Sequence, residues 1–183
     1  MALLNDCKYG YDVKDNVLRL TLIKSAVRPD ALADKGYHRY TYSLLPHAGD
    51  WREGGVVREG YELNNGLIGD WGLEIGDWGL ENGELETGDL GFSLVGVDVR
   101  HVVVSAVKEA EDGDGVIVRV YECEQRRRRD VTLTFGAPLA GIEACNLLEE
   151  RVEDRTLQQE GNRATFALDP YEIKSFRVWF AGG

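Results

Sequence analysis

Residues 102–121, VVVSAVKEAEDGDGVIVRVY, contain two β-branched runs joined by an acidic connection that includes glycines. In the second run, valines occupy every other position, and such alternation places them on one face of a strand (Val116, Val118 and Val120). Gly113 and Gly115 can adopt the positive φ of a tight reversal. The stretch therefore predicts a β-hairpin made of Val102–Val107 and Val116–Tyr121.

Similar short runs occur on both sides of this hairpin. Lys8–Val13 and Val17–Ser25 predict a second hairpin that turns at Lys14-Asp15-Asn16, and His38–Leu45 predicts a further strand before Pro46. The runs that follow the central hairpin are Val131–Phe135, Ile142–Leu148, Ala164–Leu168 and Ile173–Phe180. Many short strands with almost no helix predict an all-β fold, an antiparallel β-sandwich.

One short helix is expected around residues 50–63. Asp50 and Glu53 have the spacing of a capping pair at a helix start, and Asn64-Asn65-Gly66 is a stop signal. Gly54 and Gly55 weaken such a helix by roughly 1 kcal/mol each relative to alanine. We therefore expect the helix to depend on packing more than on propensity.

Residues 67–94 form an acidic segment rich in glycine and tryptophan. GDWGLEI and GDWGLEN follow one another, and no Lys or Arg occurs between Tyr61 and Val99. Oxygen-rich loops with glycines suit calcium, although the closely alternating carboxylates of an EF-hand loop are absent. A calcium site and a duplicated surface loop both remain open.

Composition excludes several classes of function. The net charge of −11 argues against nucleic acid as a partner, and no apolar run reaches the roughly 18 residues of a membrane helix. Three widely spaced cysteines and the lack of a signal peptide favour a cytoplasmic protein with reduced thiols. The basic run Arg126–Arg129 is bracketed by acids, which favours a solvated hairpin loop over a phosphate site.

No self-sufficient active site is visible. The three histidines, His38, His47 and His101, lack metal-ligand spacing, and no phosphate-binding loop or G-x-S-x-G motif occurs. Carboxylates are abundant, but no acid/base pair for glycoside hydrolysis is fixed by the sequence. The exception is LNDCKYGYD, residues 4–12, where polar side chains suited to sugar hydroxyls surround Gly10. An ordinary polar strand edge is the other interpretation of that segment.

Several blocks of the chain, in order, resemble one family. ALLNDCKYGYDV, LRLTLIKS, LLPHAGDWRE, REGYELNN, VKEAEDGDGVIVRVYE, NLLEE and PYEIKSFRV look like the C-terminal β region of family-38 glycoside hydrolases, the retaining α-mannosidases. The resemblance implies that residues 1–66 are terminal strands of a large β-sandwich and that residues 95–183 are a small C-terminal sandwich. Because the chain starts directly at a motif, we expect a truncated or split reading frame.

The same resemblance implies a role in hydrolysis of α-mannosides or oligosaccharides. In the family, zinc and the nucleophile belong to an α/β domain, so this chain would carry neither a cofactor nor a catalytic residue. That domain, in the same enzyme or on a partner chain, is then the expected partner. Carried over by position, Asp6, Lys8 and Tyr9 are the candidates for substrate contact.

Two other interpretations stay open. An independent carbohydrate-binding or interaction module would need an exposed aromatic platform, for which Trp51, Trp71 and Trp78 are the candidates. A plain β-sandwich without activity is the third. If residues 1–25 are cut from a larger sheet, they should present unpaired strand edges that invite association.

Overall fold

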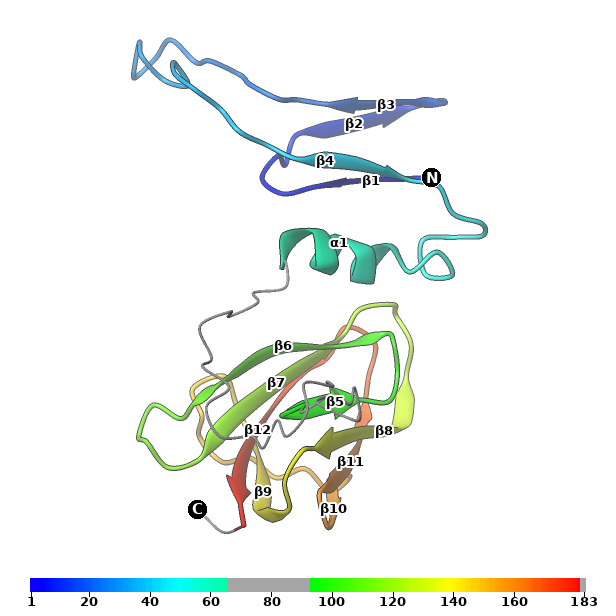
Figure 1. The fold of residues 1–183 in the computed structure, drawn as a ribbon, viewed down its shortest axis with the longest axis vertical. Coiled ribbons are helices and arrows are strands. Elements are labelled where there is room, and N and C mark those ends of the chain that lie inside the picture. The colour runs from blue at the N-terminus through cyan, green and yellow to red at the C-terminus, as the bar shows by residue number, and fades with distance from the viewer. Residues whose placement is uncertain (66–92, 182–183) are drawn as a thin grey trace, which may run out of the picture. The chain divides into compact units, whose positions relative to one another are not determined.

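A computed structural model describes residues 1–65 and 93–181. The chain divides into two compact units, Met1–Glu74 and Ile75–Gly183, and all strand pairs among the described residues are antiparallel (Figure 1). The acidic segment 67–94, with its two open interpretations, lies outside the described residues except for Ser93 and Leu94. The helix that the structure describes is too short to cross a membrane.

The N-terminal unit contains two strand pairs. β1 (Ala2–Asn5) pairs with β4 (Tyr42–Leu45), and β2 (Tyr11–Lys14) pairs with β3 (Val17–Leu20). The second pair confirms the predicted hairpin, which reverses at Asp15-Asn16 with Asp15 at φ 54°. β4 is shorter than expected, because residues 38–41 leave the ladder.

No residue between Met1 and Asn65 is buried. In the β2–β3 hairpin, Tyr11 lies opposite Leu20 and Val13 opposite Leu18, so these four apolar side chains share one face. Val13 is 67% exposed. The other face carries the Asp12–Arg19 ion pair at 2.7 Å. Alternation in Val17–Ser25 would suit a half-buried strand, but the apolar face of this hairpin is largely exposed to solvent.

Helix α1 (Val56–Asn64) begins later than the expected residue 50. The predicted capping pair does form, since Glu53 N donates to Asp50 Oδ1 at 3.0 Å and Asp50 N donates to Glu53 Oε2 at 3.3 Å. The turn that it starts is interrupted at Gly55, which adopts φ 63° and becomes the N-cap of α1. The helix ends at Asn64, as the stop signal predicted.

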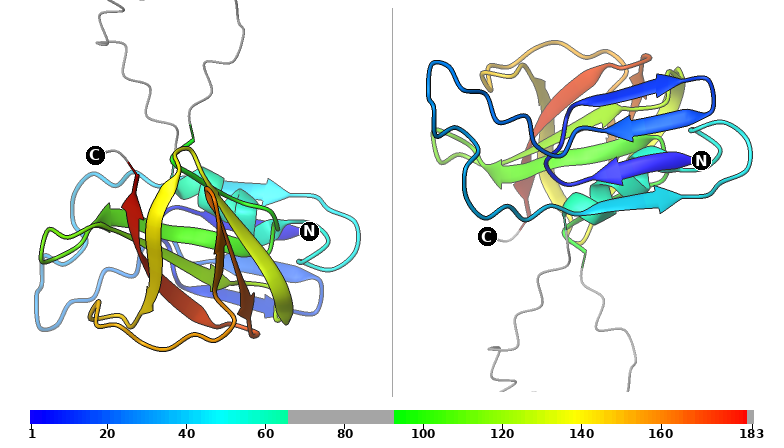
Figure 2. Two further views of the ribbon diagram at one scale, coloured as in Figure 1. Left: turned by 90° about the horizontal axis from the view of Figure 1, so that it is seen from below. Right: turned by 90° about the horizontal axis from the view of Figure 1, so that it is seen from above.

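The C-terminal unit is a β-sandwich of two four-stranded antiparallel sheets, seen from two further directions in Figure 2. One sheet has the order β6-β7-β12-β9, made of Val102–Glu109, Val116–Glu122, Ile173–Phe180 and Leu139–Cys145. The other has the order β10-β11-β8-β5, made of Gln158–Glu160, Arg163–Leu168, Arg128–Phe135 and Val95–Val97. The antiparallel all-β fold is thereby confirmed, including the central hairpin β6–β7.

The core lies between these two sheets. Val118 and Val120 of β7 are buried in it, as their alternation predicted, together with Phe176 and Val178 of β12. Ile117 has the opposite parity and is buried as well, because Ala110 and Cys145 cover it on the outer face. The alternation therefore predicted the faces correctly, but tertiary packing decides whether the outward residue is exposed.

Two expectations about segment boundaries are wrong. Arg128 and Arg129 open strand β8, so the basic run is only partly a loop. The run predicted as Ile142–Leu148 is instead β9, Leu139–Cys145, because the Asn146 carboxamide accepts hydrogen bonds from Leu148 N and Glu150 N. That side chain builds a turn that ends the strand and leaves Leu148 80% exposed.

Replacing Phe166 by alanine tests where the stability of the chain resides. Phe166 is fully buried, so Phe166→Ala should lower the free energy of unfolding of the C-terminal unit by about 3–5 kcal/mol. Urea denaturation followed by near-UV circular dichroism measures this. The matched control is Tyr37→Ala, since Tyr37 is 93% exposed and its loss should change stability by no more than about 0.5 kcal/mol. Similar losses in the two variants would contradict the assignment of the core.

Candidate functional site

Asp6, Lys8 and Tyr9 lie on the connection between β1 and β2, and their side chains make different contacts. Asp6 Oδ1 accepts a hydrogen bond from Thr41 N at 2.9 Å, and Asp6 N donates to Thr41 O at 3.2 Å. The bond from Thr41 lowers the pKa of the Asp6 carboxyl, which in turn raises the pKa of the neighbouring Cys7 thiol. Asp6 thus ties the connection to the segment entering β4.

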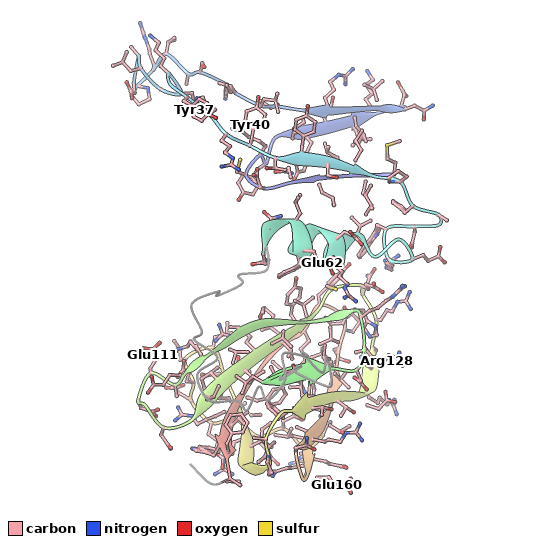
Figure 3. The ribbon with its side chains drawn as sticks, viewed as in Figure 1. Tyr37, Tyr40, Glu62, Glu111, Arg128 and Glu160 are labelled. Carbon is pink, nitrogen blue, oxygen red and sulfur yellow. The ribbon has the colours of Figure 1, made fainter. Side chains whose placement is uncertain are left out.

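On the same connection, Lys8 is half-buried and Tyr9 is exposed. The main chain of Lys8 is held by a hydrogen bond from its N to Asn5 Oδ1 at 2.6 Å, and its Nζ lies 5.1 Å from the centroid of the Tyr40 ring. Tyr9 is 87% exposed. Tyr40 and the exposed Tyr37 come from the segment that leads into β4 (Figure 3). The contact between the Lys8 ammonium and the Tyr40 ring attaches the connection to that segment.

Lys8 lines a hollow of about 350 Å³ in the N-terminal unit. The other lining residues come from the position before β2, the segment after β3 and the loop that follows: Gly10, Thr21, Leu22, Ile23, Lys24, Asp34 and His38. Of the three predicted residues, the hollow includes Lys8 alone. Sequence reasoning missed Lys24, Asp34 and His38, since a loop brings them to Lys8 and no local pattern marks them.

Hydrogen bonds hold the wall of this hollow in place. Asp34 Oδ2 accepts from Ser25 N at 3.0 Å, and Asp34 O lies 2.8 Å from His38 Nε2. Thr21 N donates to Gly10 O at 2.8 Å, and a Cβ at Gly10 would lie 3.2 Å from Thr21 Cβ. Gly10 therefore permits the close approach of these two segments. Within the described ranges, no cluster of His, Cys, Asp or Glu is suited to a metal ion.

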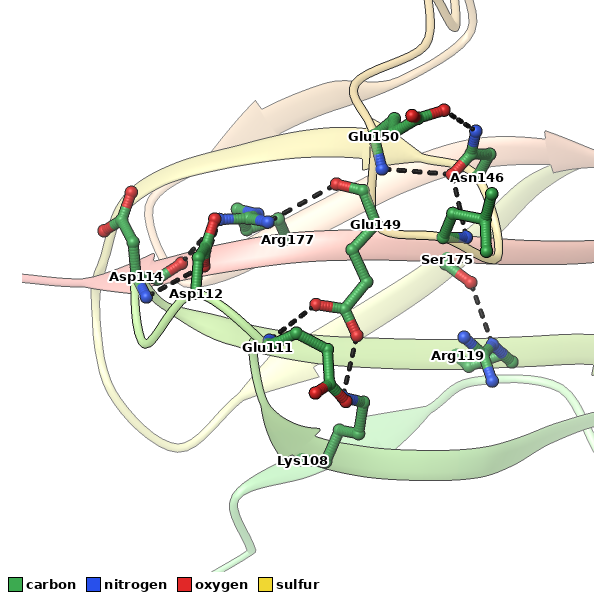
Figure 4. Close-up of polar contacts among 11 residues, drawn as sticks. Lys108, Glu111, Asp112, Asp114, Arg119, Asn146, Glu149, Glu150, Ser175 and Arg177 are labelled. Atoms are coloured by element: carbon green, nitrogen blue, oxygen red, sulfur yellow. Dashed lines mark hydrogen bonds and ion pairs between the residues drawn. The ribbon is translucent and has the colours of Figure 1, made fainter.

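A second polar cluster lies on the outer face of the C-terminal sandwich (Figure 4). Arg177 Nη1 donates to both carboxylate oxygens of Asp112, at 2.8 and 2.7 Å, and Arg177 Nη2 donates to Glu149 O at 3.3 Å. Lys108 Nζ lies 2.7 Å from Glu149 Oε1, which lowers the pKa of that carboxyl. These groups satisfy one another, so the cluster fastens the β6–β7 turn to the 146–151 loop.

A third cluster of titratable groups is buried at the far end of β7. The carboxylate of Glu122 accepts hydrogen bonds from Glu124 N at 2.7 Å and Tyr171 N at 2.9 Å. His101 is buried beside it, and burial, followed by the nearby Arg128, lowers its pKa. Since main-chain donors occupy the Glu122 carboxylate, this cluster organises chain connections and does not form an acid/base pair.

Two family models match this chain. "Glycosyl hydrolases family 38 C-terminal domain" matches residues 1–32, and "Glycosyl hydrolases family 38 C-terminal beta sandwich domain" matches residues 101–176. Together they include the Lys8 connection and most of the C-terminal sandwich.

Similar proteins are α-mannosidases by name. Alpha-mannosidase G of Dictyostelium discoideum is 34% identical over 97% of this chain, and Alpha-mannosidase 2C1 of Mus musculus is 34% identical over 96% of it. Alpha-mannosidase of Saccharomyces cerevisiae is 32% identical over 98% of the chain. The chain spans only 16% of the length of the first two relatives and 17% of the third.

The burial of His101 predicts a pH dependence of stability. Because its pKa is lowered in the folded state, the native chain binds fewer protons than the unfolded chain just below the ordinary value of 6.5. The contribution of His101 is therefore complete above that pH and decreases as the pH falls below it. Urea denaturation of wild type at about pH 7.5 and about pH 5.5 should show this decrease.

His101→Gln should reduce this pH dependence, whatever its effect on absolute stability. Glu122, Glu124, Arg126 and Arg128 also act on His101, and all four remain in the variant. The matched control is His47→Gln, since His47 is half-buried on a loop of the N-terminal unit. Equal pH dependence in wild type and His101→Gln would show that the buried imidazole does not titrate with folding.

Proposed function

The chain belongs to glycoside hydrolase family 38, and we propose that it is the C-terminal part of an α-mannosidase-like enzyme. In this proposal it supports and lines a carbohydrate-binding cleft, while an α/β domain elsewhere in the enzyme or on a partner chain carries zinc and the nucleophile. The proposed substrates are α-mannosides or oligosaccharides, and the names of the relatives, which are α-mannosidases, support the first of these. The free cysteines Cys7, Cys123 and Cys145 support a cytoplasmic location.

The observation that carries the proposal is the uncovered apolar face of the N-terminal unit. Tyr11, Val13 and Leu18 are each more than 40% exposed, although they share one face of a regular hairpin. Contiguous apolar surface of this kind is typical of a face that another protein layer covers. The relatives are about six times longer than this chain, which supports a covering layer supplied by the rest of such an enzyme.

Within the proposed cleft, we assign different roles to the three candidate residues. Lys8 Nζ would donate hydrogen bonds to sugar hydroxyls, and the exposed Tyr9 would offer its ring and hydroxyl. Asp6 would hold the connection in place through its hydrogen bond from Thr41 N. The carboxylate can accept further hydrogen bonds, and these would be available to sugar hydroxyls. A β-sheet scaffold with hydrogen-bonded connections can hold one such wall in position.

A stand-alone carbohydrate-binding module finds less support. The face of Trp51 is covered by Arg52, whose Cζ lies 4.6 Å from the ring centroid, and Trp179 Nε1 donates to Asp114 at 2.8 Å. Trp71 and Trp78 lie outside the described residues. Across residues 1–65 and 93–181, therefore, the tryptophans do not form an exposed row.

The first test is hydrolysis of a chromogenic α-mannoside by the purified chain, with added zinc and with chelator. We expect no turnover in either condition, because the proposal places metal and nucleophile outside this chain. Any affinity for methyl α-mannoside should fall in Tyr9→Ala and stay unchanged in Tyr171→Ala, a control on an exposed tyrosine of the C-terminal unit. Zinc-dependent turnover by the chain alone would overturn the proposal.

A second test uses amide hydrogen exchange, followed by mass spectrometry, on the full chain. Amides of the β2–β3 hairpin should exchange much faster than those of β7 and β12, because the hairpin has no buried residue to stabilise it. The unpaired edges should also promote self-association at high concentration, which sedimentation measures. The proposal that a covering layer is missing would be contradicted by a monomer in which amides of the N-terminal unit exchange as slowly as those of the sandwich.

A further inference from the structure

We propose that the hollow beside Lys8 binds the anionic group of a negatively charged sugar, with Lys8 and Lys24 as the charged contacts. Neither the family models nor the relatives' names assign an anion site to this chain. The sugar half of this inference rests on the proposed function. The anion half stands on the charges of the hollow alone.

The distribution of charge singles out this hollow. The whole chain carries −11, but residues 1–65 contain nine basic and nine acidic side chains, so the excess of negative charge lies entirely beyond them. The hollow contains two lysines against the single carboxylate of Asp34. That carboxylate already accepts a hydrogen bond from Ser25 N. The local charge is therefore positive within a strongly acidic chain.

The two lysines are available for a ligand. The ion pairs described within residues 1–65 are Arg19–Asp12, Arg52–Asp50 and Arg58–Glu62, and they leave out Lys8 and Lys24. Throughout the described residues, neither lysine has a carboxylate within ion-pair distance. A lysine ammonium has three donors and is a common partner of phosphate or carboxylate groups.

The remaining wall suits a sugar more than a bare ion. Thr21 lines the hollow and offers a hydroxyl group, and the Tyr40 ring lies beside Lys8. The volume of about 350 Å³ is near the lower end of small-molecule sites, which span roughly 300–1,000 Å³. A monosaccharide bearing one phosphate or carboxylate fits these features, whereas a cation would be repelled by the two ammonium groups.

The experiment is isothermal titration of the full chain with mannose 6-phosphate, mannuronate, methyl α-mannoside and inorganic phosphate. The charged sugars should bind roughly tenfold tighter than the neutral mannoside, as expected for one hydrogen-bonded charge pair, and their affinity should weaken with salt. The first two ligands distinguish a phosphate from a carboxylate source. Equal affinity for charged and neutral sugars would overturn the proposal.

Lys24→Gln should remove most of the preference for the charged sugars over methyl α-mannoside. Lys24 is exposed, so the variant should fold, which circular dichroism verifies. Lys14→Gln is the matched control, because Lys14 is an exposed lysine at the end of β2 that does not line the hollow. An unchanged preference in Lys24→Gln would overturn the assignment of the two lysines.

The remaining outcomes separate this inference from the proposed function. Inorganic phosphate binding as tightly as mannose 6-phosphate would overturn the sugar half and leave an anion site. Charged sugars that bind to a chain with zinc-dependent turnover of its own would refute the proposed function and support the anion site. Loss of methyl α-mannoside binding in Tyr9→Ala, with the charge preference kept, supports both.

Discussion

The contact on which the C-terminal unit depends is the packing of Phe166 of β11 against Phe176 of β12. Their ring centroids lie 4.6 Å apart, and because the two strands belong to different sheets, this contact crosses the sandwich. Phe135 of β8 meets Phe180 of β12 in the same way, with centroids 6.1 Å apart. Aromatic pairs contribute stability beyond that of the apolar area they bury, so these contacts hold the two sheets face to face. The inward valines of the central hairpin pack into the space between them.

Strand β12 also positions the polar cluster on the outer face of the sandwich. Arg177 lies between the buried Phe176 and Val178, so alternation turns its guanidinium outward, where it meets Asp112 and the main chain of Glu149. Lys108 completes the cluster by pairing with the Glu149 carboxylate. The core thus positions Arg177, and the satisfied network joins two loops to the sandwich.

Periodicity predicted the parts of the fold in which neighbouring residues decide the outcome. The hairpins β2–β3 and β6–β7 and the strand β12 follow directly from alternation and turn residues. Periodicity failed after β9, where the Asn146 side chain accepts main-chain hydrogen bonds and ends the strand. It also failed at Gly55, which interrupts the turn that the predicted capping pair starts. The candidate site was predictable only at Lys8. Lys24, Asp34 and His38 reach the same hollow through a loop, and their proximity depends on hydrogen bonds such as Ser25 N to Asp34 that no local pattern encodes.

The two units differ in how firmly they can hold the side chains of a binding site. A binding wall needs its side chains held by packing, and the C-terminal sandwich provides such packing for its own residues. The Lys8 connection is held by hydrogen bonds from Lys8 N to Asn5 and from Thr41 N to Asp6, and no residue between Met1 and Asn65 is buried. A covering layer on the Val13 and Leu18 face would supply the missing packing and would order the hollow at the same time. Affinity for a ligand and association with that layer should then be coupled, since each would stabilise the same arrangement of strands.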